Sequence, residues 1–339
     1  MVGSRGARPP RRRRRPHQLG DPAGRMPVAQ DTDLGADLAR DADLDPDFTP
    51  AFVVDAPGRQ SAPVVFNAPH AGSVYPPAFL AAARLSGLAL RRSEDAHVDG
   101  LFAEAPLLGA PLLRARFPRA YLDVNREPYE LDPRMFEGRL PGYANTRSMR
   151  VAGGLGTIPR LVADGHEIYA RKLGVEEGLA RVEALYKPYH RTLRRLVERT
   201  VSLFGAAVLI DCHSMPSSSL AREEMGVADI VLGDRYGTSC AGPITDLVEE
   251  ALRRRGYGVA RNKPYAGGFI TEHYGEPAAR RHALQIEINR ALYMDERTLA
   301  RGPAFATIAR DLIDAMAEVL PAIAACIGAG PAEAGLAAE

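Results

Sequence analysis

Short apolar runs alternate with longer amphipathic segments along most of the chain. Runs rich in aliphatic residues predict strands at 64–68, 112–116, 120–124, 208–212, 229–232, 257–260 and 283–289. Apolar residues at helical spacing predict helices at 76–85, 93–107, 166–186, 188–203, 239–255 and 304–327. Because strands alternate with helices, we expect an α/β fold with a mixed, mostly parallel central sheet flanked by helices.

Two segments lack this alternation. Residues 127–160 are rich in Pro, Gly and Asn and predict a long ordered loop, which in a compact domain usually carries function. Residues 1–45 are rich in Arg, Pro, Asp and Gly, and the stretch RGARPPRRRRR at 5–15 holds seven arginines. We expect a disordered extension, or a start at Met26, rather than a nucleic-acid or membrane-binding arm. Residues 46–330 then form a single domain.

Composition narrows the class of protein. The chain has 339 residues, 46% hydrophobic and 25% charged, with a net charge of +1, as expected for an ordinary globular protein. Its three cysteines (Cys212, Cys240 and Cys326) are too few and too scattered for a disulfide framework, and no apolar run reaches the ~18 residues of a membrane span. We expect a cytoplasmic protein whose folded domain binds neither nucleic acid nor membrane. Its oligomeric state stays open.

Polar residues follow several of the predicted strands. His70 comes after the strand at 64–68, Asn125 and Arg126 come after 120–124, and His213 comes after 208–212. Ligands of such sheets bind beyond the carboxyl ends of the strands. Glu287 differs, because it lies inside an apolar strand, where a carboxylate is costly unless it is paired or functional.

Histidines from two strand ends together with carboxylates favour a divalent metal ion, and zinc suits this mixture. His70 and His213 supply two ligands, and the segment SEDAHVD offers Glu94, Asp95 or Asp99 as a third. Asp211 shares a strand face with His213 and can accept the other ring N–H of a ligand histidine.

Plainer interpretations of these residues exist. A histidine at a strand end is often only a structural hydrogen-bonding group, and a glutamate in a strand can face solvent at a sheet edge. Ser214 is a poor candidate nucleophile, because HSMPS lacks the G-x-S-x-G pattern. Spacing alone therefore leaves metal binding open.

Eight segments, in order, resemble the N-formylglutamate amidohydrolase family over roughly residues 60–300. They are FNAPHAGSVYP, SEDAHVDGLF, RAYLDVNREPYELDPRMF, GLGTIPR, YKPYH, LIDCHSMPS, KPYAGGFITEHYG and LQIEINRALYMDE. This family is distantly similar to the zinc carboxypeptidases, which implies a phosphorylase/hydrolase-like fold. Carboxypeptidases use a His-x-x-Glu pair of ligands, but Ser73 stands where that glutamate would be. The resemblance therefore implies His70, Asp95 and His213 as the zinc ligands.

The resemblance also implies a reaction, the hydrolysis of N-formyl-L-glutamate to formate and L-glutamate in histidine degradation. Glu287 is implied as the general base. A small acidic substrate needs fixed cations, for which Arg126 with Asn125 is the first choice and Arg119 the second. Residues 264–276 predict a glycine-hinged lid from which Thr271 and Tyr274 bind substrate. Two alternatives remain: a hydrolase of another N-acyl amino acid or amide, and a non-enzymatic metal or ligand binder.

Overall fold

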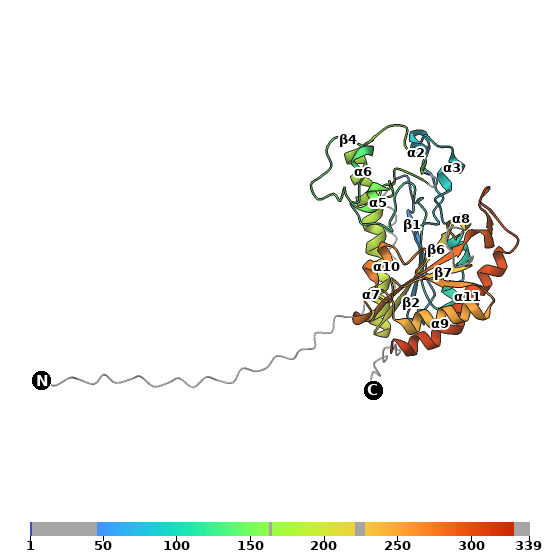
Figure 1. The fold of residues 1–339 in the computed structure, drawn as a ribbon. Coiled ribbons are helices and arrows are strands. Elements are labelled where there is room, and N and C mark those ends of the chain that lie inside the picture. Colours follow the sequence, from blue (N-terminus) through green and yellow to red (C-terminus); the bar gives the residue numbers. More distant parts are fainter. Residues whose placement is uncertain (2–45, 163–164, 221–227, 329–339) are drawn as a thin grey trace.

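A seven-stranded sheet forms the centre of the protein (Figure 1). The computed structural model describes the chain except for residues 2–45, 163–164, 221–227 and 329–339, so the predicted extension lies outside the described residues. In sheet order the strands are β1 (Phe52–Asp55), β3 (Leu112–Ala115), β2 (Val64–Ala68), β6 (Ala207–Met215), β9 (Arg281–Asn289), β7 (Ile230–Gly233) and β8 (Val259–Arg261).

The strand directions confirm a mixed, mostly parallel sheet. Strands β3, β2, β6 and β9 run parallel to one another. At one edge β1 is antiparallel to β3, and at the other β7 is antiparallel to β9 and parallel to β8. The carboxyl ends of β2, β6 and β9 therefore meet at the same edge of the sheet, which is where a ligand is expected.

Helices cover both faces of the sheet (Figure 1). On one face α7 (Lys187–Phe204) packs against β2 and β6. The other face packs with α4 (Val98–Leu101), α9 (Gly242–Arg254) and α11 (Phe305–Cys326) in one apolar cluster. None of the helices in the described part of the chain is both long and apolar enough to span a membrane.

Side chains alternate along the central strands, so one face of the sheet carries apolar core residues and the other carries the polar residues of β6. In β6, Val208, Ile210 and Cys212 pack into the cluster that contains α9 and α11. The intervening residues of the strand, including Asp211 and His213, project to the α7 face. All nine residues of β6 are buried, so its polar side chains need internal partners.

Shorter elements complete the described chain. They are α2 (Pro77–Ala82), α3 (Gly87–Arg91), η1 (Ala105–Leu108), η2 (Pro133–Met135), β4 (Phe136–Glu137), α5 (Met149–Ala152), β5 (Leu173–Gly174), α6 (Val175–Arg181), the π-helical η4 (Val182–Tyr186), α8 (Ser217–Leu220), α10 (Phe269–Tyr274), η5 (Pro277–Ala279), η6 (Arg290–Leu292), β10 (Met294–Asp295) and β11 (Ala300–Arg301).

The strand predicted at 120–124 is wrong. The amides of Tyr121 and Leu122 donate to the carbonyl of Pro118, and the amide of Asp123 donates to Thr157, so this stretch is a turn and not part of the sheet. At this edge of the sheet β3 pairs with β1, a strand that the apolar pattern did not predict.

The helix predicted at 93–107 is also wrong over most of its length. Helix α4 begins only after His97, which has a left-handed backbone (φ 67°) and makes no side-chain capping hydrogen bond. The chain turns at 93–96 because the amide of Asp95 donates to the carbonyl of His70 (3.0 Å) instead of to a helical partner. This turn aims the Asp95 carboxylate at the end of β2.

The predicted helices at 166–186 and 188–203 form one helical run that starts only at Val175. Residues 166–172 instead make isolated bridges to other loops, among them the pair of Ala83 and Tyr169. Pro188 lies just after the π-helical turn of Val182–Tyr186, where the helix has already departed from regular hydrogen bonding. The proline therefore does not divide the run.

Candidate active site

Three side chains from separate segments converge at the carboxyl edge of the sheet. His70 follows β2, Asp95 lies in the turn before α4, and His213 lies inside β6, which is longer than predicted and does not end before it. All three are buried, with at most 2% of each residue exposed. The structure thus brings together the residues that the resemblance implied as metal ligands.

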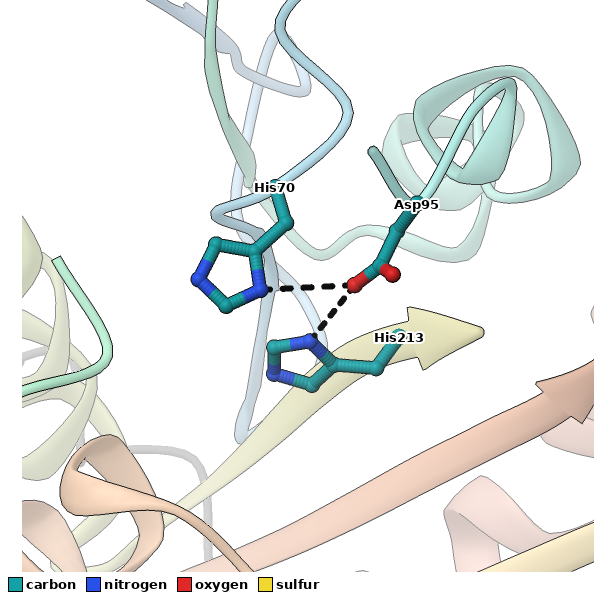
Figure 2. A group of neighbouring side chains, drawn as sticks. All are labelled: His70, Asp95 and His213. Atoms are coloured by element: carbon teal, nitrogen blue, oxygen red, sulfur yellow. Dashed lines mark hydrogen bonds and ion pairs between the residues drawn. The ribbon is translucent and has the colours of Figure 1, made fainter. Parts of the chain in front are cut away.

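Both imidazoles turn the same ring nitrogen toward the aspartate (Figure 2). Asp95 Oδ2 lies 2.9 Å from His213 Nδ1 and 3.3 Å from His70 Nδ1. The candidate ligand atoms of the three residues all lie within 4.8 Å of one another. Two nitrogens and one oxygen converging on one point form a donor set for a divalent metal ion.

A second carboxylate binds the far side of each ring. His70 Nε2 lies 2.7 Å from Asp123 Oδ1, and His213 Nε2 lies 2.9 Å from Asp211 Oδ2. A carboxylate accepts a hydrogen bond from a protonated ring nitrogen, so Asp123 and Asp211 favour the tautomer with Nε2 protonated, in which the Nδ1 lone pair is free for a metal ion. The position expected for Asp211 is therefore observed, whereas Asp123 was missed, although it stands in the DVNR segment two residues before Asn125.

Asp211 is itself held by a buried chain of hydrogen bonds. Asn67 Nδ2 donates to Asp211 Oδ1 (2.8 Å), and the Tyr189 hydroxyl of α7 donates to Asn67 Oδ1 (2.6 Å). A buried carboxylate is costly without such partners. The aspartate inside the apolar run of β6 is therefore explained by its contact with His213.

One atom of this site lacks a hydrogen-bond partner. Among the described residues His70 Nδ1 is buried and makes no hydrogen bond. Ligand atoms ~2.1 Å from a tetrahedral zinc ion lie ~3.4 Å apart, close to the 3.3 Å that separates His70 Nδ1 from Asp95 Oδ2. The residues present therefore fit a metal ion, which would satisfy this nitrogen.

Asp95 is held in its ionised form. Burial opposes ionisation, but the hydrogen bond with His213, the adjacent His70 ring and the positive charge of Arg119 outweigh it and keep the pKa of Asp95 well below its usual range. Its other oxygen, Oδ1, accepts a hydrogen bond from Arg290 Nη2 at 2.9 Å and from Ser214 Oγ at 3.3 Å. Arg290 was not predicted, and Ser214 is a hydrogen-bonding member of this network.

Glu287 lies beside the three residues. It pairs with His213 in the register of β6 and β9, and paired residues of neighbouring strands project from the same face. Burial raises the pKa of Glu287 to about 7, although nearby His213 opposes the rise. Gln285 Nε2 donates to Glu287 Oε1 at 2.8 Å and orients the carboxyl group. A glutamate with this pKa can accept and return a proton near neutral pH.

A cavity of about 400 Å³ opens onto this site. His70, His213 and Glu287 line it together with three of the predicted substrate-binding residues, Arg119, Asn125 and Arg126. Other parts of its wall come from α5 and the turn after it, from Pro216, from residues 264–268 and from Gln285. This volume is within the range of small-molecule sites.

The three predicted polar residues of this wall are already anchored. Arg119 Nη2 donates to Asp123 Oδ2 (2.8 Å), and the amide oxygen of Asn125 accepts from the backbone of Ile270 (2.7 Å). Arg126 donates through Nε to the carbonyl of Leu155 (2.8 Å) and through Nη1 to that of Asn125. These contacts fix the groups before any substrate binds.

The other two predicted substrate-binding residues lie away from the cavity. Residues 264–276 are not simply a lid, because they include α10, and Thr271 and Tyr274 are buried on it. Thr271 Oγ1 donates to the carbonyl of Gly268, and the Tyr274 hydroxyl contacts His190. What the segment presents to the cavity is instead 264–268.

The alternative third ligands do not join the group. Glu94 accepts hydrogen bonds from Tyr75 (2.7 Å) and Arg91 (3.0 Å) and is not part of the group of candidate ligand atoms. Asp99 caps the amide of Gly100, and Ser73 is exposed. Asp95 is therefore the carboxylate that the structure places between the rings.

Two histidines and a carboxylate converge beside a buried glutamate at the edge of a mixed α/β sheet. This arrangement defines the class of protein as a hydrolase with residues placed to hold a metal ion. Residues 62–294 match the model of the N-formylglutamate amidohydrolase family. The chain belongs to this family, which confirms the resemblance found in the sequence.

Individual relatives agree with this membership. The chain is 30% identical over 242 residues to an N-formylglutamate deformylase of Pseudomonas aeruginosa, a match that covers 70% of this chain and 85% of that one. It is 40% identical to an N-formylglutamate amidohydrolase of Ralstonia eutropha JMP134 of known crystal structure, with a TM-score of 0.76 over 80% of this chain and 99% of that chain. The gene product Atu2144 of Agrobacterium tumefaciens shares the fold at 21% identity (TM-score 0.57, 80% and 96% covered).

Proposed function

We propose that the protein hydrolyses N-formyl-L-glutamate to formate and L-glutamate in a metal-dependent reaction. The observation that carries the proposal is the convergence of His70 Nδ1, Asp95 Oδ2 and His213 Nδ1 beside Glu287, in a chain that belongs to this family. The relatives named for this activity support the substrate.

His70, Asp95 and His213 would hold the ion, and zinc suits two imidazoles and one carboxylate. When bound, such an ion supplies Lewis acidity and lowers the pKa of water at the site. Asp123 and Asp211 keep both rings in the tautomer that the ion requires.

Glu287 acts as the general base and then as the general acid. Its carboxylate takes a proton from the attacking water, and the same oxygen later gives that proton to the leaving nitrogen of the formamide. A pKa of about 7, caused by burial, allows both transfers near neutral pH. Arg119, whose Nη1 lies 3.9 Å from Asp95 Oδ1, is close enough to the ligands to stabilise negative charge that develops on the formyl oxygen.

Arg126 and Asn125 bind the substrate next to the reacting group. Asn125 Nδ2 lies 3.3 Å from His213 Nε2, and Arg126 Nη2 lies 3.6 Å from Asp123 Oδ2, so both belong to the shell around the ligands. A planar guanidinium in this position suits a carboxylate of a small acidic substrate.

With no disulfide among its described cysteines, a cytoplasmic location remains our expectation.

The test is formate release from a panel of N-formyl and N-acetyl amino acids. We expect the wild-type protein to prefer N-formyl-L-glutamate, and Glu287→Gln to lower kcat by ~10²–10⁴-fold while metal content is unchanged. Faster turnover of an N-acetyl substrate would assign the protein to a different amidohydrolase activity. Loss of metal in Glu287→Gln would contradict its role as a base.

A further inference from the structure

Five arginines line the cavity, and four of them have partners. Arg119 and Arg126 bind Asp123 and backbone carbonyls, and Arg290 binds Asp95. Arg92 also has an interaction partner. For the guanidinium of the fifth, Arg150, no hydrogen bond or ion pair is found among the described residues, and its side chain is exposed at the cavity. Among the described residues of this lining, Arg150 therefore has a guanidinium that is not already committed to a partner.

Backbone contacts hold the turn that carries Arg150 against Arg126. Arg150 lies on α5, where Ser148 Oγ accepts the amide of Val151 (3.1 Å) at the start of the helix. The amide of Leu155 donates to the carbonyl of Arg150 (2.8 Å), and the carbonyl of Leu155 accepts from Arg126 Nε (2.8 Å). One turn of chain therefore carries Arg150 and is bound by Arg126.

The two cations interact unfavourably when no anion lies between them. Burial lowers the pKa of Arg126 to about 10, and the positive charges of Arg119 and Arg150 add to this effect, while Asp123 opposes it. Guanidinium groups held near each other without a carboxylate for each of them form a site for an anion. A substrate with two carboxylates matches two such groups.

We propose that Arg150 determines specificity by binding the side-chain carboxylate of the substrate, while Arg126 binds its α-carboxylate. This assignment rests on the proposed function. The α-carboxylate is attached to the same carbon as the scissile nitrogen, and Arg126 adjoins the metal ligands through Asn125 and Asp123. The side-chain carboxylate lies two methylenes farther away, and Arg150 is correspondingly farther out, on an exposed helix.

Binding of N-formyl-L-glutamate and of its uncharged near-isostere N-formyl-L-glutamine tests this assignment. The Glu287→Gln variant serves as the background, because its slow turnover allows binding to be measured by calorimetry. Adding Arg150→Ala should weaken binding of the glutamate ligand by about 10- to 100-fold, the value of a charge-assisted hydrogen bond, and leave the glutamine ligand within about twofold. Arg126→Lys should weaken both ligands.

Arg147→Ala is the matched control, because Arg147 is exposed three residues earlier and does not line the cavity. It should change neither affinity. Equal losses for both ligands in Arg150→Ala, or no loss for either, would overturn the proposal. Arg150→Gln repeats the measurement with a more conservative side chain. If the wild type releases no formate from N-formyl-L-glutamate, the proposed function fails, while the binding data still decide the role of Arg150.

Discussion

At the inner end of the cavity His70 and His213 are buried beside Asp95. Asp123 and Asp211 bind the two rings on the side away from Asp95, and Arg290 binds Asp95. At its outer end Arg150 is exposed on a short helix and has no partner among the described residues. The inner end is fixed before substrate arrives, as a site that stabilises developing charge must be. The outer end is left unsatisfied, so binding there depends on the charge of the substrate.

Metal binding and activity should both be lost when one of the three candidate ligands at the inner end is removed. We expect His213→Ala to weaken metal binding by more than ~100-fold, since loss of a group that only orients a ligand already costs 10–100-fold. Formate release should fall with it. Metal content by mass spectrometry and activity on N-formyl-L-glutamate measure the effect.

His166→Ala is the control for that variant, because His166 is exposed and does not belong to the candidate ligand set. It should retain the metal content of the wild type. Equal metal content in His213→Ala and His166→Ala would show that the three residues do not hold the ion.

Acid should lower the stability of the fold through the buried His190 of α7. His190 Nε2 lies 2.8 Å from the carbonyl of Val124, and burial lowers the pKa of His190 to about 4 from a usual 6.5. Between pH 6.5 and pH 4 His190 therefore binds a proton in the unfolded chain but not in the folded one. The free energy of unfolding falls as the pH drops through this range, by up to about 3 kcal/mol.

Urea unfolding of the wild type and His190→Gln at pH 7 and pH 4.5 measures this contribution. The variant lacks the titrating group, so the difference in its free energy of unfolding between the two pH values should be smaller. An identical pH dependence in both proteins would mean that His190 is not the group responsible.

The orienting carboxylates should have an intermediate effect. Asp123→Asn keeps the shape but loses the charge that accepts His70 Nε2–H at 2.7 Å. Affinity for the metal should fall ~10–100-fold, with the fold retained. Titration of the metal-free protein with zinc compares it with Asp132→Asn, which alters a buried aspartate that binds Arg134 and Arg160 instead of a ligand histidine. Similar zinc affinities in the two variants would be inconsistent with the role of Asp123.

The smallest effect should come from Tyr274→Phe. The Tyr274 hydroxyl contacts His190 at 3.0 Å and does not line the cavity. We expect the free energy of unfolding to fall by about 0.5–1.5 kcal/mol, the value of a buried hydrogen bond, with KM unchanged. A several-fold rise in KM without loss of stability would return Tyr274 to the substrate-binding set.

Strand periodicity predicted much of the sheet, and strand ends predicted much of the site. The run at 64–68 is β2 as predicted, and the two-residue spacing of Asp211 and His213 correctly predicted that both project from one face of β6. The failures fall where backbone hydrogen bonds leave the regular pattern. The turn that carries Asp95 and the turn at 120–124 are stabilised by bonds to distant carbonyls, which no local pattern records.

By itself the sequence determined the family, the fold class and the residue types available for chemistry, because these follow from motifs and from the periodicity of buried positions. Only the tertiary structure decided which carboxylate lies between the histidines, that Asp123 orients His70, and that Arg290 holds Asp95. Asp95 and Arg290 are far apart in the chain, and so are Asp123 and His70. Their contacts depend on how loops cross the end of the sheet, which is set by packing and long-range hydrogen bonds and not by local sequence.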